Sequence, residues 1–199
     1  MEKILLLIFL SYFPQIIAQQ KITYLDGNDK VITEAQFKIT PKHFVAINDS
    51  LNIHKAVTNR SEKGNTAAVT EIYKRLNNLT PLDPLKPMVI IFYPGIDACN
   101  SSGSATKSSR RKWFKDLEYM INKIAEAKPI AIYKSKEGSK DYKGVRKWYK
   151  DPEAIIERTF FKYHYPCSSY VIIMPNGDYV AYFGEFGDNI IHDFEDIIK

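Results

Sequence analysis

The second half of the chain carries short apolar runs that have the length of β-strands. Residues 88–93 are continuously apolar, which predicts a strand buried on both faces. Residues 129–133 predict a second strand. Residues 170–174 and 179–183 flank the turn signal Pro-Asn-Gly-Asp, and this pattern predicts a β-hairpin.

Helical periodicity separates these strands. Residues 66–79 place four apolar side chains one turn apart, and a longer helix after residue 104 repeats six on one face: Trp113, Phe114, Leu117, Met120, Ile121 and Ile124. Asp151-Pro152-Glu153 begins another helix, and a last one starts near Asp188. The predicted order is strand, helix, strand, helix, strand, strand, helix, an α/β class with right-handed crossovers between parallel strands.

The first 86 residues predict a leader and an extension. Residues 1–18 resemble a signal peptide, with Lys3 before an apolar stretch and cleavage after Ala18, although an uncleaved short anchor is the alternative. Residues 19–86 predict an N-terminal extension with a short hairpin, which pairs with itself or an edge, and the helix at 66–79. Residues 40–63 are polar and predict irregular structure. The main domain is then 87–199.

Composition narrows the class of protein. Of 199 residues, 45% are hydrophobic, which is enough for the core of one domain. The net charge is +5, but Lys and Arg alternate with Asp and Glu, so we expect no nucleic-acid partner. No zinc spacing, P-loop or dinucleotide motif occurs, and we expect no cofactor and no resident metal. After signal cleavage we expect no stable membrane insertion.

The predicted leader also sets the chemistry of the two cysteines. Export, either to a bacterial periplasm or out of the cell, places the chain in an oxidising compartment. The richness in Lys and Asn, together with a short leader that ends in Ala-Gln, favours a Gram-negative bacterium over a eukaryotic source. An even count of two cysteines, Cys99 and Cys167, most often forms one disulfide there.

The element order and two segments resemble a known family. Val89-Ile-Ile-Phe-Tyr-Pro94 precedes Cys99, and Ser168-Ser169 leads into the strand, Asn-Gly turn and strand before the terminal helix. Over residues 88–199 the chain is similar to secreted thioredoxin-like (redoxin) proteins. The resemblance implies a thioredoxin-like sheet flanked by helices, here with an N-terminal extension, and a redox site at the loop of Cys99.

The sequence departs from that family at the redox motif itself. The family's Cys-x-x-Cys is replaced by Cys99-Asn-Ser-Ser102, so Ser102 stands where a resolving thiol is expected. Ile96 replaces the hydroxyl residue that peroxidase relatives need. Counting back from Asn176-Gly177 places Ser168 at the family's cis-proline position with Cys167 directly before it, whereas a short insertion would place Pro166 there. The resemblance implies that Cys99 and Cys167 approach within disulfide range.

Three interpretations of this cysteine pair remain open. It can be a structural disulfide that stabilises the fold. It can be redox-active, with Cys99 as a nucleophile at a helix N-terminus and Cys167 as the resolving thiol. Finally, His164-x-x-Cys167 with Cys99 offers a soft ligand set for copper(I) or zinc.

The expected function is therefore thiol-disulfide chemistry or its vestige, with Cys99, Cys167 and Ser102 as candidate catalytic residues. Its partners would be protein thiols or an extended peptide. Tyr163 and Tyr165 either pack against the sheet or form a platform for such a peptide. The competing hypothesis is a non-catalytic binding module that uses residues 95–104 and 163–169.

Overall fold

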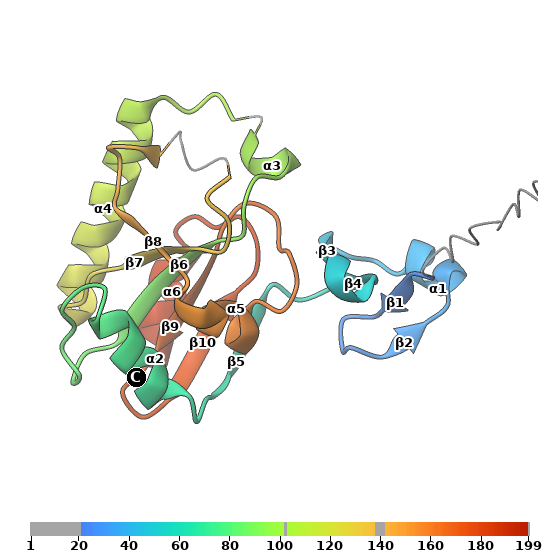
Figure 1. Cartoon of the computed structure of the whole chain (residues 1–199), viewed down its shortest axis with the longest axis horizontal. Coiled ribbons are helices and arrows are strands. Elements are labelled where there is room, and N and C mark those ends of the chain that lie inside the picture. The colour runs from blue at the N-terminus through green and yellow to red at the C-terminus, as the bar shows by residue number, and fades with distance from the viewer. Residues whose placement is uncertain (1–20, 102, 138–141, 199) are drawn as a thin grey trace, which may run out of the picture.

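The computed structural model describes residues 21–101, 103–137 and 142–198. They form a mixed α/β structure with helices and two mixed sheets (Figure 1). The predicted signal peptide at residues 1–18 and the candidate Ser102 lie outside the described residues. Among the described helices, none combines the length and apolar character needed to cross a bilayer.

The larger sheet has six strands in the order β5-β10-β9-β6-β7-β8. Their bounds are Ser61–Asn65 for β5, Asp178–Tyr182 for β10, Ser169–Ile173 for β9, Met88–Tyr93 for β6, Ile130–Tyr133 for β7 and Trp148–Lys150 for β8. Strand β6 is parallel to β7 and antiparallel to β9, and β9 forms the predicted hairpin with β10. The strands predicted from apolar runs are therefore confirmed.

Strand β6 is buried on both faces, as its continuous apolar run predicts. All six of its residues are at most 5% exposed. Met88, Ile90 and Phe92 belong to one hydrophobic cluster, whereas Val89 and Ile91 belong to the other. Because successive strand residues point to opposite faces, this division places one core on each side of the sheet.

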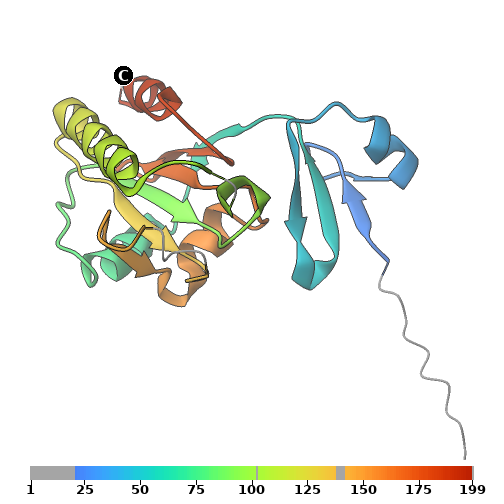
Figure 2. The ribbon, with the colours of Figure 1, turned by 90° about the horizontal axis from the view of Figure 1, so that it is seen from above.

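Helices cover both faces of this sheet (Figure 2). On one face lie α2 (Val69–Asn77) and α5 (Ile155–Phe160), with the short 3₁₀ turn η3 (Pro152–Ala154) before α5. On the other face lie α4 (Lys107–Ala125) and α6 (Asn189–Ile197). The helices predicted from periodicity are thus confirmed.

The buried stripe of α4 is narrower than its apolar pattern. Phe114, Leu117 and Ile121 are buried, but Trp113 is 38% exposed and Met120 is 39% exposed.

The start of helix α4 is fixed by its N-cap residue, Thr106. The Thr106 hydroxyl accepts a hydrogen bond from the backbone N–H of Ser109 at 3.1 Å.

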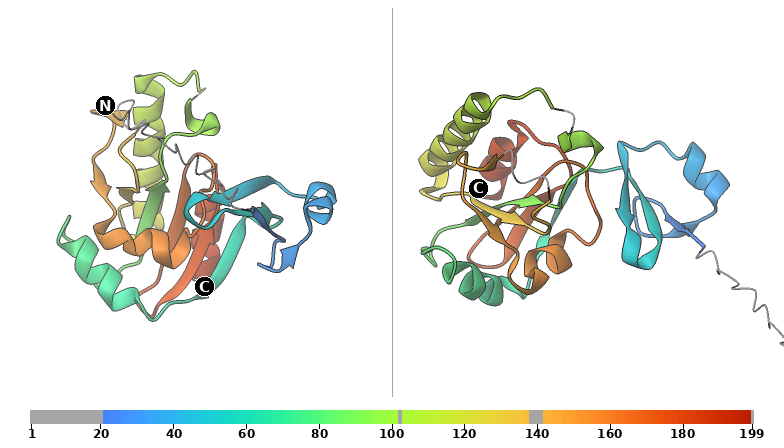
Figure 3. Two further views of the ribbon diagram at one scale, coloured as in Figure 1. Left: turned by 45° about the vertical axis from the view of Figure 1, so that its right-hand side comes forward. Right: turned by 45° about the horizontal axis from the view of Figure 1, so that its top comes forward.

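The N-terminal region holds more structure than the predicted hairpin. Its second sheet has the order β2-β1-β4-β3. The elements are β1 (Thr23–Leu25), β2 (Val31–Ile32), α1 (Glu34–Ile39), β3 (Phe44–Asn48), η1 (Asp49–Leu51) and β4 (Ile53–Val57). The β1–β2 hairpin is present, but β1 also pairs in parallel with β4. Figure 3 shows this sheet to one side of the six-stranded sheet.

The expectation that residues 40–63 are irregular is wrong, because β3, β4 and the start of β5 occupy them. Strand β5 reads Ser-Glu-Lys-Gly-Asn and carries no apolar signal; it forms because the backbone of β10 offers a free edge. Strand β5 and helix α2 also join the larger structure, since Ile72 and Leu76 of α2 are fully buried in its core.

Candidate functional site

Cys99 and Cys167 form a disulfide, with their Cα atoms 5.2 Å apart. Strands β6 and β9 are antiparallel, and Phe92 near the end of β6 pairs with Ser169 at the start of β9. The segment after β6 and the segment before β9 consequently leave the sheet at the same edge. This register brings together two residues that are 68 positions apart in the sequence.

Asp97 and Asn100 organise the loop that carries Cys99. The carboxylate of Asp97 accepts a hydrogen bond from the backbone N–H of Asn100 at 2.9 Å, and the amide oxygen of Asn100 accepts one from the N–H of Asp97 at 3.0 Å. The Asn100 side chain also donates to the carbonyl of Gly95 at 2.8 Å. This reciprocal pattern is that of a capping box, and it begins the single turn α3 (Ala98–Ser101).

Cys99 does not lie at the N-terminus of a long helix. Cys99 lies in the four-residue α3, whereas the long helix α4 begins eight residues later at Lys107. A single turn has few aligned peptide dipoles, so it contributes little to stabilising a thiolate. Any activation of the sulfur must come from the side chains around it.

The same aspartate reaches the loop of Cys167. The Asp97 Oδ2 atom accepts a hydrogen bond from the backbone N–H of Cys167 at 2.9 Å and lies 3.0 Å from His164 Nε2. The side chain of Asp97 is 14% exposed and that of His164 is 31% exposed. Asp97 therefore connects both cysteine-bearing loops and places an acid-base pair beside the disulfide.

Cys167 itself has a left-handed backbone, with φ of 66°. This conformation is unfavourable for a residue with a Cβ atom. The hydrogen bond to Asp97 and the bridge to Cys99 hold it in place. Every peptide bond among the described residues is trans.

The four-stranded sheet holds the Cys167 loop from the other side. The backbone N–H of His164 donates to the carbonyl of Ile47 at 2.6 Å, and the side chain of Asn48 donates to the carbonyl of Lys162 at 2.9 Å. The N-terminal sheet thus contacts the loop three residues before the disulfide. None of these contacts is visible in the sequence pattern.

The two tyrosines of this loop pack rather than form an open platform. Tyr165 is 5% exposed and stacks on Phe183 with ring centroids 4.4 Å apart; burial raises the pKa of its hydroxyl. The hydroxyl of Tyr163 donates to Asp29 at 3.0 Å. Partial burial and that hydrogen bond raise the pKa of Tyr163 to about 12. The packing interpretation therefore holds for Tyr165.

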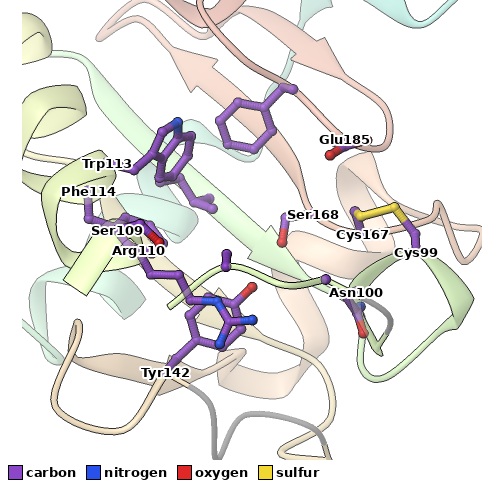
Figure 4. Close-up of a pocket in the computed structure, with 14 residues that line it drawn as sticks. Cys99, Asn100, Ser109, Arg110, Trp113, Phe114, Tyr142, Cys167, Ser168 and Glu185 are labelled. Carbon is purple, nitrogen blue, oxygen red and sulfur yellow. A yellow bond between two sulfur atoms is a disulfide. The ribbon is translucent and has the colours of Figure 1, made fainter. Parts of the chain in front are cut away.

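Both sulfurs line an open cavity of about 440 Å³ (Figure 4). The lining also includes Ser168 and Asn100, the aromatic side chains Trp113, Phe114, Tyr142 and Phe186, and the charged Arg110 and Glu185. In Figure 4 the disulfide stands at one end of this space, with Trp113 and Arg110 toward the other. The bridge is accordingly reachable by a molecule in the cavity.

Of the residues singled out from the sequence, Cys99 and Cys167 are bonded to each other at this site, and His164 contacts Asp97 beside them. The group whose ligand atoms lie within 4.8 Å of one another is Asp97, Cys99 and Cys167, so His164 is not part of it. Ser102 lies outside the described residues. Asp97 was missed. Its signal is the spacing Asp97-x-x-Asn100, which is compatible with a helix start three residues after Pro94, the proline that follows β6. No known protein family, curated protein or solved structure matches the chain.

Proposed function

We propose that this chain is an exported, thioredoxin-like protein that exchanges disulfides with protein thiols through Cys99 and Cys167. The observation that carries the proposal is the position of the bridge, whose two sulfurs border a cavity beside an Asp97–His164 pair. The order of strands β7-β6-β9-β10, with β9 and β10 antiparallel, supports the resemblance to the thioredoxin fold.

The reaction is an exchange of two electrons and two protons with a dithiol partner. A thiolate of the partner attacks one sulfur of the bridge, so a mixed disulfide forms and the other cysteine leaves as a thiolate. The partner's second thiolate then attacks the mixed disulfide. The partner ends as a disulfide, while Cys99 and Cys167 end as thiols. The reverse direction reduces a partner disulfide.

Asp97 and His164 are positioned to serve this exchange. The carboxylate lies 2.9 Å from the backbone nitrogen of Cys167, and the imidazole lies 3.0 Å from the carboxylate. Through its hydrogen bond to the backbone of Cys167, Asp97 fixes the loop that carries one sulfur of the bridge, and His164 contacts the same carboxylate oxygen.

A redox titration of the purified full chain tests the proposal. The protein is equilibrated in glutathione buffers of defined potential, quenched with acid, alkylated and weighed by mass spectrometry. We expect a reversible two-electron transition at a potential less negative than about −300 mV, the range below which structural bridges lie. A bridge that stays closed throughout this range under native conditions would refute the redox function and leave a structural disulfide in a binding module.

A second candidate function is metal binding by the reduced site. Ligand atoms of Asp97, Cys99 and Cys167 all lie within 4.8 Å of one another, and two thiolates suit copper(I) or zinc. The test is titration of the reduced chain with copper(I) against a competing chelator. Equal copper affinity in the reduced chain and in Cys99→Ser would exclude this candidate.

A further inference from the structure

A second cavity, of about 430 Å³, lies between helix α4 and the segments that lead into strands β7 and β8. It contains neither sulfur of the bridge, and it shares only the buried Phe114 with the cavity beside the disulfide. Among the described residues that line it, five are cations and one is acidic. We call it the basic groove, and its cations are Arg111, Lys115, Lys128, Arg146 and Lys147.

The basic groove concentrates charge that the sequence distributes. Lys and Arg alternate with Asp and Glu along the chain, whose net charge is +5. Three separate segments nevertheless bring their cations together here: helix α4, the turn before β7 and the loop before β8. The groove therefore has an excess of four positive charges. Like charges this close repel one another, so an anion that binds among them relieves the repulsion.

The one carboxylate in the groove, that of Glu118, compensates a largely buried cation. The side chain of Arg146 is 12% exposed; its guanidinium lies 3.4 Å from the Glu118 carboxylate and donates to the carbonyl of Pro129. The ammonium of Lys128 lies farther from the same carboxylate, at 4.0 Å. Arg146 and Glu118 thus form an ion pair that adds no net charge, and the excess comes from the other cations.

The charges of these other cations are accessible. All four are exposed to solvent: Arg111, Lys115, Lys128 and Lys147. Arg111 donates to the carbonyl of Gly144 at 3.0 Å, a hydrogen bond that does not neutralise the guanidinium. The ammonium of Lys147 lies 4.6 Å from the ring centroid of Tyr149. In the part of the chain that the structure describes, Arg111, Lys115 and Lys147 form no ion pair with an acidic side chain.

We infer that the basic groove binds a small molecule that carries a diphosphate group on an organic body. Two linked phosphates bear a charge of about −3 near neutral pH, close to the excess of four in the groove. Guanidinium and ammonium groups form strong charge-assisted hydrogen bonds with phosphate oxygens. The partly exposed side chains of Leu82, Val145 and Tyr149 line the same groove and offer apolar contact to the organic body.

The size of the groove favours a small molecule over a polymer. A volume of about 430 Å³ falls in the range of small-ligand pockets. The groove contains no part of the disulfide, so this binding is independent of the proposed exchange reaction.

Calorimetry of the full chain with its disulfide closed tests the inference, at low ionic strength where exposed charges are little screened. The probes are ADP, inorganic pyrophosphate, adenosine and citrate. We expect ADP to bind at least as tightly as pyrophosphate and about tenfold or more tighter than adenosine, because the diphosphate supplies most of the binding. Citrate has a similar charge spread over separate carboxylates and should bind about tenfold more weakly than pyrophosphate.

Two double variants with equal changes of net charge separate the groove from the rest of the surface. Lys115→Ala with Lys147→Ala removes two cations of the groove and should weaken the binding of ADP and pyrophosphate about tenfold. Lys30→Ala with Lys74→Ala replaces two exposed lysines that do not line the groove, and should change the affinity less than about twofold. Urea unfolding of both variants should coincide with that of the parent, because the replaced side chains are exposed.

The result has a clear reading in either direction. No detectable binding of ADP or pyrophosphate, equal affinity for citrate, or an affinity that the Lys115, Lys147 double variant leaves unchanged overturns the inference. Weaker binding of ADP than of pyrophosphate also overturns it, since the groove would then reject an organic body. The probes are redox-inert and the bridge stays closed, so these outcomes do not depend on whether the proposed disulfide exchange occurs.

Discussion

Opening the Cys99–Cys167 bridge should lower the free energy of unfolding by an amount that the topology sets. The bridge closes a loop between residues 68 positions apart. Loop-closure entropy for that length corresponds to about 4.4 kcal/mol at 25 °C. The left-handed backbone of Cys167 opposes this stabilisation by about 1–2 kcal/mol, because a reduced loop is free to relax. The expected net loss on reduction is about 3 kcal/mol.

Urea unfolding of the oxidised and reduced full chain measures this loss, with tryptophan fluorescence and circular dichroism as two probes. The double variant Cys99→Ser, Cys167→Ser is the control, since the same reductant should leave its stability unchanged. A linked measurement is the redox potential. A bridge that contributes about 3 kcal/mol lies about 64 mV below the same pair in the unfolded chain.

A loss of less than about 1 kcal/mol would refute the reasoning, because loop closure alone predicts several times more. It would mean that the loop is already ordered in the unfolded ensemble or that the bridge stores far more strain than the backbone of Cys167 indicates. A loss well above 5 kcal/mol would also contradict it. In that case the reduced loops would have released other contacts, such as those with the N-terminal sheet.

Three further predictions concern positions outside the bridge. Asp151→Ala removes a 4% exposed carboxylate that accepts two backbone N–H groups at the start of α5, and should cost about 2 kcal/mol in urea unfolding, whereas Asp151→Asn should cost less. Gly177→Ala puts a Cβ atom 2.6 Å from the carbonyl of Thr66 at a φ of +92°, so thermal unfolding should shift downward by several degrees. The pKa of Tyr163 is about 12 in the folded chain, above its ordinary value of 10.0. The protonated hydroxyl therefore contributes fully to the free energy of unfolding below pH 10, and this contribution is lost as the pH rises toward 12. Tyr163→Phe should flatten that decline in stability.

Much of the larger sheet could be predicted because its central strands carry their own signals. Strand β6 is apolar at every position because both of its faces are covered by helices. The β9–β10 hairpin is predicted by the turn dipeptide Asn176-Gly177. Helix α4 was predictable from its period, although Trp113, which belongs to the predicted apolar face, is partly exposed and lines the cavity. The spacing of apolar residues along a helix does not show which of them lie beyond the part of the sheet that the helix covers.

Other elements depend on partners that are remote in the chain. Strand β5 lies at a sheet edge, where backbone pairing suffices and apolar side chains are not required. Strand β8, at the other edge, has only three residues, which is too short for a periodic pattern. The N-terminal sheet was missed for a similar reason, because β1 finds its parallel partner in β4 rather than in its own hairpin alone. Such pairings are decided by geometry across the whole molecule.

The sequence by itself determined the α/β class, the central strands, the main helices and the two cysteines as the residues of interest. Only the tertiary structure decided that Asp97 joins both cysteine loops, that His164 lies beside it, and that Arg110 and Trp113 share a cavity with the bridge. The physical reason is that periodicity and turn chemistry act between near neighbours, whereas the register of β6 against β9 sets which distant loops meet.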